Sequence, residues 1–142
     1  RVPELIIFVG LPGSGKSTYY SSHFARTHVH VSKDLMANVR NRESRQNAMI
    51  EDALASGKSV AIDNTNPSAA IRAPLIATGK RHGFRIIAYY FDCSVKTALM
   101  RNQQREEGRG RVPKVAIFVT KKKLQPPALD EGFDEVHVVP CE

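Results

Sequence analysis

One glycine-rich segment near the amino terminus constrains the fold more than any other part of this sequence. Residues 10–17 read Gly-Leu-Pro-Gly-Ser-Gly-Lys-Ser, which fits the pattern G-x-x-x-x-G-K-[ST] of a phosphate-binding loop, or P-loop. An apolar run, Leu5–Val9, precedes the loop, and a segment that places Tyr20 and Phe24 four residues apart on one helical face follows it. Strand, loop and helix in this order are the context that the motif requires. The sequence therefore predicts a P-loop domain.

The rest of the chain alternates between strand-like and helical stretches, the pattern of an α/β domain with a mostly parallel sheet flanked by helices. We expect five strands, at Leu5–Val9, His28–Val31, Ser59–Ile62, Phe84–Phe91 and Glu135–Val139. After the first helix we expect others at Ser44–Ser56, from Asn66 onward, at Ser94–Glu106 and from Pro113 up to Pro126. The predicted fold class is an α/β P-loop kinase with a five-stranded sheet.

Turn and cap residues set the expected ends of these helices. Gly57 is a natural carboxyl-terminal stop for the second helix. Asn66 and Pro67 form a cap and first-turn pair for the third. Pro74 lies inside that helix and should kink or shorten it.

The length and charge limit the kind of molecule. A chain of 142 residues suits one domain with one core, residues 1–142, and its start at Arg1 allows it to be part of a longer protein. The formal charge of +7 favours polyanions such as nucleic acid, ATP or acidic membranes, although ordinary basic drift gives the same value. No run approaches the roughly 18 apolar residues of a membrane helix. Cys93 and Cys141 lack metal-ligand spacing, so we expect a reduced protein inside the cell, in the cytoplasm or nucleus.

Each residue type in the P-loop has a physical role in binding ATP. The glycines let the backbone wrap closely around the phosphates with its N–H groups pointing inward, and the helix amino terminus adds a positive dipole end. Lys16 pairs with β- and γ-phosphate oxygens, and the Ser17 hydroxyl coordinates Mg²⁺. The expected ATP contacts of the loop are Gly10, Gly13, Ser14, Gly15, Lys16, Ser17 and Thr18.

Two predicted strands end in acidic and polar residues. Asp34 follows one of them, and a carboxylate there can accept the proton of an attacking hydroxyl or cap the next helix. Asp63 follows another, where it can hold a water molecule of Mg²⁺, while Thr65 and Asn66 can bond a substrate. Helix capping is the alternative here as well, above all for Asn66.

Basic residues in the second half of the chain allow two interpretations. Arg101 and Arg105 lie four apart on a predicted helix that leads into the Gly/Arg-rich loop Glu107–Val112. They can belong to a lid that covers the nucleotide and stabilises the transferred charge, or they can be a solvated basic face. Lys121–Lys123 fits a solvated helix face better than a site.

Several segments together resemble the kinase module of polynucleotide 5′-hydroxyl kinases, especially the kinase half of animal polynucleotide kinase-phosphatases. The resemblance runs over nearly the whole chain. It is carried by Gly10–Thr18, His28–Asp34, Val60–Pro67 and the tail Pro126–Phe133. The first segment is shared by very many enzymes, whereas Asp-Asn-Thr-Asn-Pro at 63–67 and the tail are far more particular.

The resemblance implies roles for individual residues. Asp34 falls on the general base for the 5′-hydroxyl, and Lys16 and Ser17 on the phosphate and Mg²⁺ ligands. Arg101 and Arg105 fall on the lid helix, where Arg105 would contact the phosphates of ATP. Thr65 falls on a threonine of the substrate side. The family also implies fused or partner phosphatase or ligase domains.

The chain departs from the family pattern beside Asp34. Lys33 stands where the family often has Arg, and Ala37-Asn38 where phage members place an Arg that grips the acceptor phosphate. Arg40, Arg42 or Arg72 can replace that grip, and Arg72 is the one we place on the acceptor side.

These observations predict an ATP- and Mg²⁺-dependent kinase that phosphorylates the 5′-hydroxyl end of DNA or RNA. Asp34, Lys16 and Arg105 would be catalytic, and Asp63 would join Ser17 at the metal. A small-molecule kinase acting on a sugar, nucleoside or antibiotic hydroxyl is the alternative, against which the basic charge argues. A nucleotide-binding domain without catalysis is the third, and it has no need of a base such as Asp34.

Overall fold

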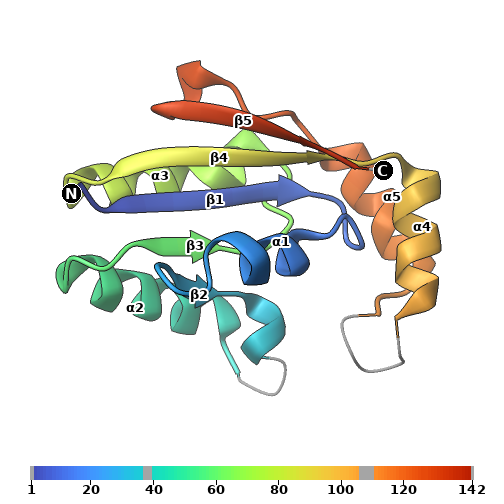
Figure 1. The fold of residues 1–142 in the computed structure, drawn as a ribbon, viewed down its shortest axis with the longest axis horizontal. Helices are drawn as coiled ribbons and strands as arrows, with labels where there is room; N and C mark the ends of the chain where they lie inside the picture. Colours follow the sequence, from blue (N-terminus) through green and yellow to red (C-terminus); the bar gives the residue numbers. More distant parts are fainter. Residues whose placement is uncertain (1, 37–39, 106–110, 142) are drawn as a thin grey trace.

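The strand before the P-loop, β1 (Glu4–Gly10), lies at the centre of a five-stranded sheet in the computed structural model, which describes residues 2–36, 40–105 and 111–141 (Figure 1). All strand pairs are parallel, in the order β2-β3-β1-β4-β5. The other strands are β2 (Val29–Val31), β3 (Val60–Ile62), β4 (Arg85–Asp92) and β5 (Glu135–Pro140). The five predicted strands are confirmed, with ends that differ by no more than one residue.

Helices cover both faces of the sheet because β1 is apolar on both sides. The side chains of Leu5, Ile7 and Val9 pack against α2 (Arg42–Ala55) and α3 (Ala69–Arg81). On the opposite face Ile6 and Phe8 pack against α1 (Lys16–His23). Residues 5–9 are fully buried, as expected for a central strand of a parallel sheet.

A third group of helical elements gathers at the carboxyl end of the strands. There α4 (Val95–Gln104) and α5 (Lys114–Lys123) pack on each other next to the loop that leaves β1, as Figure 1 shows. Short 3₁₀ turns, η1 (Lys33–Met36) and η2 (Leu129–Glu131), follow β2 and precede β5. The predicted helices are confirmed apart from their ends, and both Glu106 and most of the predicted Gly/Arg-rich loop lie outside the described residues.

The predicted cap of α3 is wrong. The cap is Ser68, whose hydroxyl accepts a hydrogen bond from the Ile71 N–H, because Asn66 instead adopts a left-handed conformation with φ +40°. Of the two effects predicted for Pro74, a kink or a shorter helix, the shorter helix is not seen, because α3 continues to Arg81. The prediction for Gly57 holds, since φ is +72° just after α2.

The expectation of reduced cysteines is also wrong in this structure. Cys93 follows β4 and Cys141 follows β5, and because these strands are neighbours the two Cα atoms come within 4.8 Å and the sulfurs are bonded. Both cysteines pack with Ala98 of α4 and Ile117 of α5.

Candidate active site

The P-loop fits its place only because two positions are glycine. Gly13 and Gly15 have φ values of +81° and +90°, a conformation that other residues rarely adopt. A Cβ atom on Gly13 would lie 2.6 Å from the carbonyl oxygen of Ala98, and one on Gly15 would lie 2.8 Å from a guanidinium nitrogen of Arg101. The loop is therefore pressed against α4, the predicted lid helix.

Lys16 points back into the loop. Its Nζ donates to the carbonyl oxygens of Leu11 (2.7 Å) and Gly10 (3.2 Å) and to Ser14 Oγ (3.3 Å). The pKa of Lys16 is lowered to about 8, chiefly by burial; Asp63 and Asp34 oppose the shift and Arg105 adds to it. The ammonium group thus lies among oxygen acceptors at the centre of the loop, and Arg105, one of the two arginines predicted for the lid, is close enough to affect its pKa.

Ser17 and Asp63, predicted to share a metal ion, are in contact. Ser17 Oγ donates to Asp63 Oδ2 over 2.8 Å. The same oxygen lies 2.8 Å from Nε2 of His30 on β2, a contact that the sequence interpretation missed. The only sequence signal for this contact is that His28 and His30 lie two residues apart on a predicted strand. Its partner can be identified only once β2 is known to pair with β3.

Asp34 faces the P-loop across a cleft of about 290 Å³. Its backbone N–H is bonded to Ser32 Oγ, and Asn41 takes the capping position of α2, so Asp34 does not cap that helix. Its carboxylate makes no hydrogen bond to another residue of the described part of the chain. We call this cleft the acceptor-side cleft, after the role predicted for Asp34, and its wall includes Lys16, Ser17, Lys33, Asp34, Arg42, Asp63, Thr65, Asn66 and Arg105.

A second cleft, of about 560 Å³, lies on the other side of the P-loop. Its lining includes Arg101, the end of β5 at Val139 and Pro140, and Gly13, Ser14, Gly15 and Thr18 from the P-loop and the start of α1. Arg105 and Gly13 line both clefts. The loop therefore separates two openings, with Arg105 at the place where they meet.

Comparison with known proteins agrees with this geometry. A profile of the family described as "AAA domain" matches residues 5–127. The chain belongs to this family. With its P-loop and parallel sheet it is a P-loop kinase, and a loop of this kind implies ATP binding.

Individual relatives differ in what their names say. A bifunctional polynucleotide phosphatase/kinase of Schizosaccharomyces pombe is 31% identical over 96% of this chain, and the chain spans only 33% of that protein. A fungal RNA kinase shares the fold at a TM-score of 0.72 and 16% identity, covering 100% of this chain and 39% of its own. A gluconokinase of Sinorhizobium meliloti shares the fold at a TM-score of 0.67 and 20% identity, over 99% of this chain and 84% of its own.

Arg72 does not reach the acceptor-side cleft of this kinase, so its prediction as a substrate ligand is wrong. The residue is fully buried, and its guanidinium donates to both carboxylate oxygens of Glu131 (2.8 and 2.9 Å) and to the carbonyl oxygen of Asn66 (2.9 Å). Burial would raise the pKa of Glu131, but the hydrogen bonds from Arg72 and from the Ala128 N–H hold it below its usual value. Arg72 therefore ties α3 to η2.

Asn66 lines the cleft but is occupied in a similar way. Its side-chain amide donates to the carbonyl oxygen of Phe8 over 2.8 Å, and the residue is buried. Next to it, the carbonyl oxygen of Thr65 accepts from the Gly10 N–H at 3.1 Å. These bonds hold the segment after β3 against the start of the P-loop, which leaves the Thr65 side chain as the predicted substrate contact on this wall.

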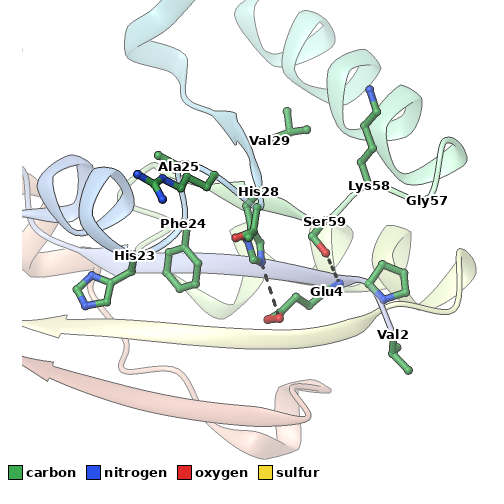
Figure 2. Close-up of a pocket in the computed structure, with 13 residues that line it drawn as sticks. Val2, Glu4, His23, Phe24, Ala25, His28, Val29, Gly57, Lys58 and Ser59 are labelled. Carbon is green, nitrogen blue, oxygen red and sulfur yellow. Dashed lines mark hydrogen bonds and ion pairs between the residues drawn. The ribbon is translucent and has the colours of Figure 1, made fainter.

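A larger hollow, of about 780 Å³, lies at the opposite end of the sheet (Figure 2). There the His28 ring points toward Glu4, 3.8 Å away, and Glu4 N–H donates to Ser59 Oγ. Burial lowers the pKa of His28, although Glu4 opposes this. Ligands of parallel sheets gather at the carboxyl ends of the strands, so this hollow is not the nucleotide site.

In the described residues, no helix is both long enough and apolar enough to span a membrane.

Proposed function

We propose that this P-loop kinase transfers the γ-phosphoryl group of ATP to the 5′-hydroxyl end of a DNA or RNA strand. The observation that carries the proposal is that Asp34, Lys16 and the basic side chain of Arg42 face one cleft. The similarity to the fission yeast phosphatase/kinase, over 96% of this chain, supports the same acceptor. That relative also supports a phosphatase domain as a fused or separate partner.

The two clefts suggest where the two substrates bind. The triphosphate would occupy the P-loop, and the nucleoside of ATP would occupy the cleft between Arg101 and the end of β5 at Val139-Pro140. Arg105, which lines both clefts, would then lie beside the phosphoryl group in transfer. Positive charge there stabilises the charge that spreads over the phosphoryl oxygens in the transition state.

Ser17 and Asp63 fit Mg²⁺ because both offer hard oxygen ligands at adjacent positions. Within residues 2–36, 40–105 and 111–141 no group of three or more His, Cys, Asp or Glu side chains is placed to hold a metal. The remaining ligands would therefore be phosphate oxygens and water, which is the usual situation for Mg²⁺ in kinases. Bound Mg²⁺ supplies charge neutralisation at the β- and γ-phosphates.

Asp34 would act as the general base. Its carboxylate takes the proton from the 5′-hydroxyl as the new bond from that oxygen to the γ-phosphorus forms, and the bond from the γ-phosphorus to the β,γ-bridging oxygen breaks to release ADP. Lys16, held in the loop, neutralises charge on the transferred group. An exposed aspartate that caps no helix is available for this role.

Arg42 is the better candidate for gripping the acceptor phosphate. It begins α2 and lines the acceptor-side cleft, and among the described residues its side chain has only a long contact, 3.5 Å, to the Lys33 carbonyl oxygen. Lys33 lines the same cleft and is paired with Glu43 at 2.6 Å. Arg40 is exposed but does not line the cleft, and Arg72 is buried.

A small-molecule kinase is the second candidate. The gluconokinase shares the fold over 84% of its length, and a cleft of about 290 Å³ is large enough for one sugar. The two functions differ in the charge next to the accepting hydroxyl, which is a phosphate in a polynucleotide and absent in a neutral sugar.

The test is a transfer assay with γ-labelled ATP. Acceptors would be 5′-hydroxyl DNA and RNA oligonucleotides, a nucleoside 3′-phosphate, and neutral sugars including glucose, the aldose from which gluconate is derived. Asp34→Asn serves as the control for transfer that does not need the base. Good turnover on the neutral acceptors with none on the oligonucleotides would replace the polynucleotide proposal by the small-molecule one.

A further inference from the structure

His30 lies where β2 meets β3, beside the carboxylate that we assign to Mg²⁺. Its Nε2 is 2.8 Å from Asp63 Oδ2, and the two side chains are 23% and 3% exposed. Because an ionised carboxylate can only accept, the hydrogen of this bond is carried by His30 Nε2. We propose that His30 is a positioning residue that fixes the Asp63 carboxylate, and through it the Ser17 hydroxyl, for Mg²⁺ binding. The inference rests on the assignment of Asp63 and Ser17 under the proposed function.

The imidazole ring is itself held in place. It stacks on the ring of Tyr20 from α1, with centroids 3.9 Å apart and planes 14° from parallel. The Tyr20 hydroxyl donates to the carbonyl oxygen of His28 over 2.5 Å, so Tyr20 is fixed to the start of β2. The backbone N–H of Asp63 donates to the Val31 carbonyl oxygen at 2.7 Å. Contacts among α1, β2 and the end of β3 thus fix the position of the His30 ring relative to the Asp63 carboxylate.

The bonds at Asp63 explain why orientation matters. Ser17 and His30 both donate to Oδ2, and within the described residues Oδ1 accepts no hydrogen bond. With its hydrogen directed to Asp63, the Ser17 oxygen presents its lone pairs away from the carboxylate. Loss of the His30 bond would leave a buried carboxylate with one side-chain donor in place of two, free to turn about its χ2 angle. Residues that orient a metal ligand typically change metal affinity by about 10–100-fold when they are removed.

The test measures ATP binding by calorimetry on the full chain, without acceptor, over a range of Mg²⁺ concentrations and in EDTA. His30→Phe keeps a ring to stack on Tyr20 but removes the donor, whereas His30→Gln returns an amide N–H near the position of Nε2. We expect His30→Phe to need about 10–100-fold more Mg²⁺ for half-maximal enhancement of ATP affinity. Affinity in EDTA should equal that of the wild type, and His30→Gln should restore most of the Mg²⁺ response. His28→Gln is the matched control, because His28 lies two residues before His30 but its ring is beside Glu4 and not Asp63.

Two results would overturn the inference. One is an unchanged Mg²⁺ requirement in His30→Phe, and the other is equal weakening of ATP binding with and without Mg²⁺, which would indicate packing alone. If His30→Phe does not fold, His30→Asn against His30→Gln makes the same comparison, because the shorter amide cannot reach Oδ2.

Asp63→Asn distinguishes a failure of the metal assignment from a failure of the role proposed for His30. If it leaves the Mg²⁺ requirement unchanged, the metal assignment fails and the inference fails with it. If Asp63→Asn raises the requirement and His30→Phe does not, the role of His30 alone is wrong.

Discussion

Arg72 on α3 and Glu131 on η2 form a two-pronged ion pair, with Nε and Nη2 of the arginine 2.8 and 2.9 Å from the two carboxylate oxygens. The arginine side chain is 0% exposed and the glutamate side chain 13%. A buried charge left without its partner is costly, so this pair identifies Arg72 as a structural residue.

The first prediction concerns this pair. Arg72→Met keeps much of the side-chain volume but strands Glu131, and it should lower the free energy of unfolding by about 3–5 kcal/mol in urea titration. Arg81→Ala removes an exposed pair with Glu51 of similar length, 2.7 Å, and should cost less than about 1 kcal/mol. If Arg72→Met kept wild-type stability and lost only acceptor binding, Arg72 would be a substrate ligand after all.

Arg72 also shows which kind of contact could not be predicted from the sequence. The P-loop and the five strands could be predicted because their signals are local: a fixed motif and short apolar runs. Arg72 and Glu131 are 59 positions apart, and His30 and Asp63 are 33 apart, so each pair exists only through the packing of distant segments. Cys93 and Cys141 likewise meet only because β4 and β5 are neighbours.

Local signals also failed where two residues competed for one role. Asn66 and Ser68 are both good helix caps, and the sequence does not rank them. The structure uses Ser68 as the cap because the Asn66 amide is bonded to the Phe8 carbonyl oxygen. A tertiary contact thus decided what the local preference left open.

The second prediction follows from the pKa of Lys16, about 8 in the free protein. Bound phosphate favours the charged ammonium, so ATP binding takes up a proton once the pH exceeds this pKa. Affinity should therefore be constant below about pH 8 and fall by up to about tenfold per pH unit above it. Calorimetry from pH 6.5 to 9.5 measures this, with Lys16→Met as the control that binds weakly and shows no such step.

The third prediction separates chemistry from folding at Asp34. Asp34→Asn keeps the shape but cannot take the proton, so kcat should fall by about 10²–10⁴-fold. The side chain is exposed and bonds no other described residue, so the melting temperature and the affinity for ATP should hardly change. A variant that melts earlier and keeps its turnover would show that Asp34 stabilises the fold and does no chemistry.

The fourth prediction tests the lid arginines by position. Arg105 lines both clefts, whereas Arg101 lines only the one assigned to the nucleoside. Arg105→Ala should lower kcat by roughly 10²-fold or more, as expected when one contact to the transition state is lost. Arg101→Ala should act mainly on the KM for ATP. Lys122→Ala on α5 lies outside both linings and is the control; comparable losses in all three would indicate bulk charge.

The last prediction concerns the acceptor and uses salt as the probe. A polynucleotide end brings phosphates beside its hydroxyl, and binding them releases counterions. For a single strand the logarithm of affinity falls with the logarithm of salt concentration with a slope of about −0.7 per phosphate contacted. KM for a 5′-hydroxyl oligonucleotide should therefore rise steeply between low and physiological salt, whereas KM for a neutral acceptor should stay flat.

Arg42 makes this prediction specific to one side chain. If Arg42 grips one phosphate, Arg42→Ala should reduce the slope by about 0.7 while leaving kcat at saturating acceptor nearly unchanged. Arg40→Ala, which removes an equal charge outside the cleft lining, should leave the slope within error of the wild type. Base identity should have little effect, because phosphate contacts position a strand without reading its sequence. Equal slopes for Arg42→Ala and Arg40→Ala would mean that the +7 surface charge as a whole, and no grip in the cleft, attracts the strand.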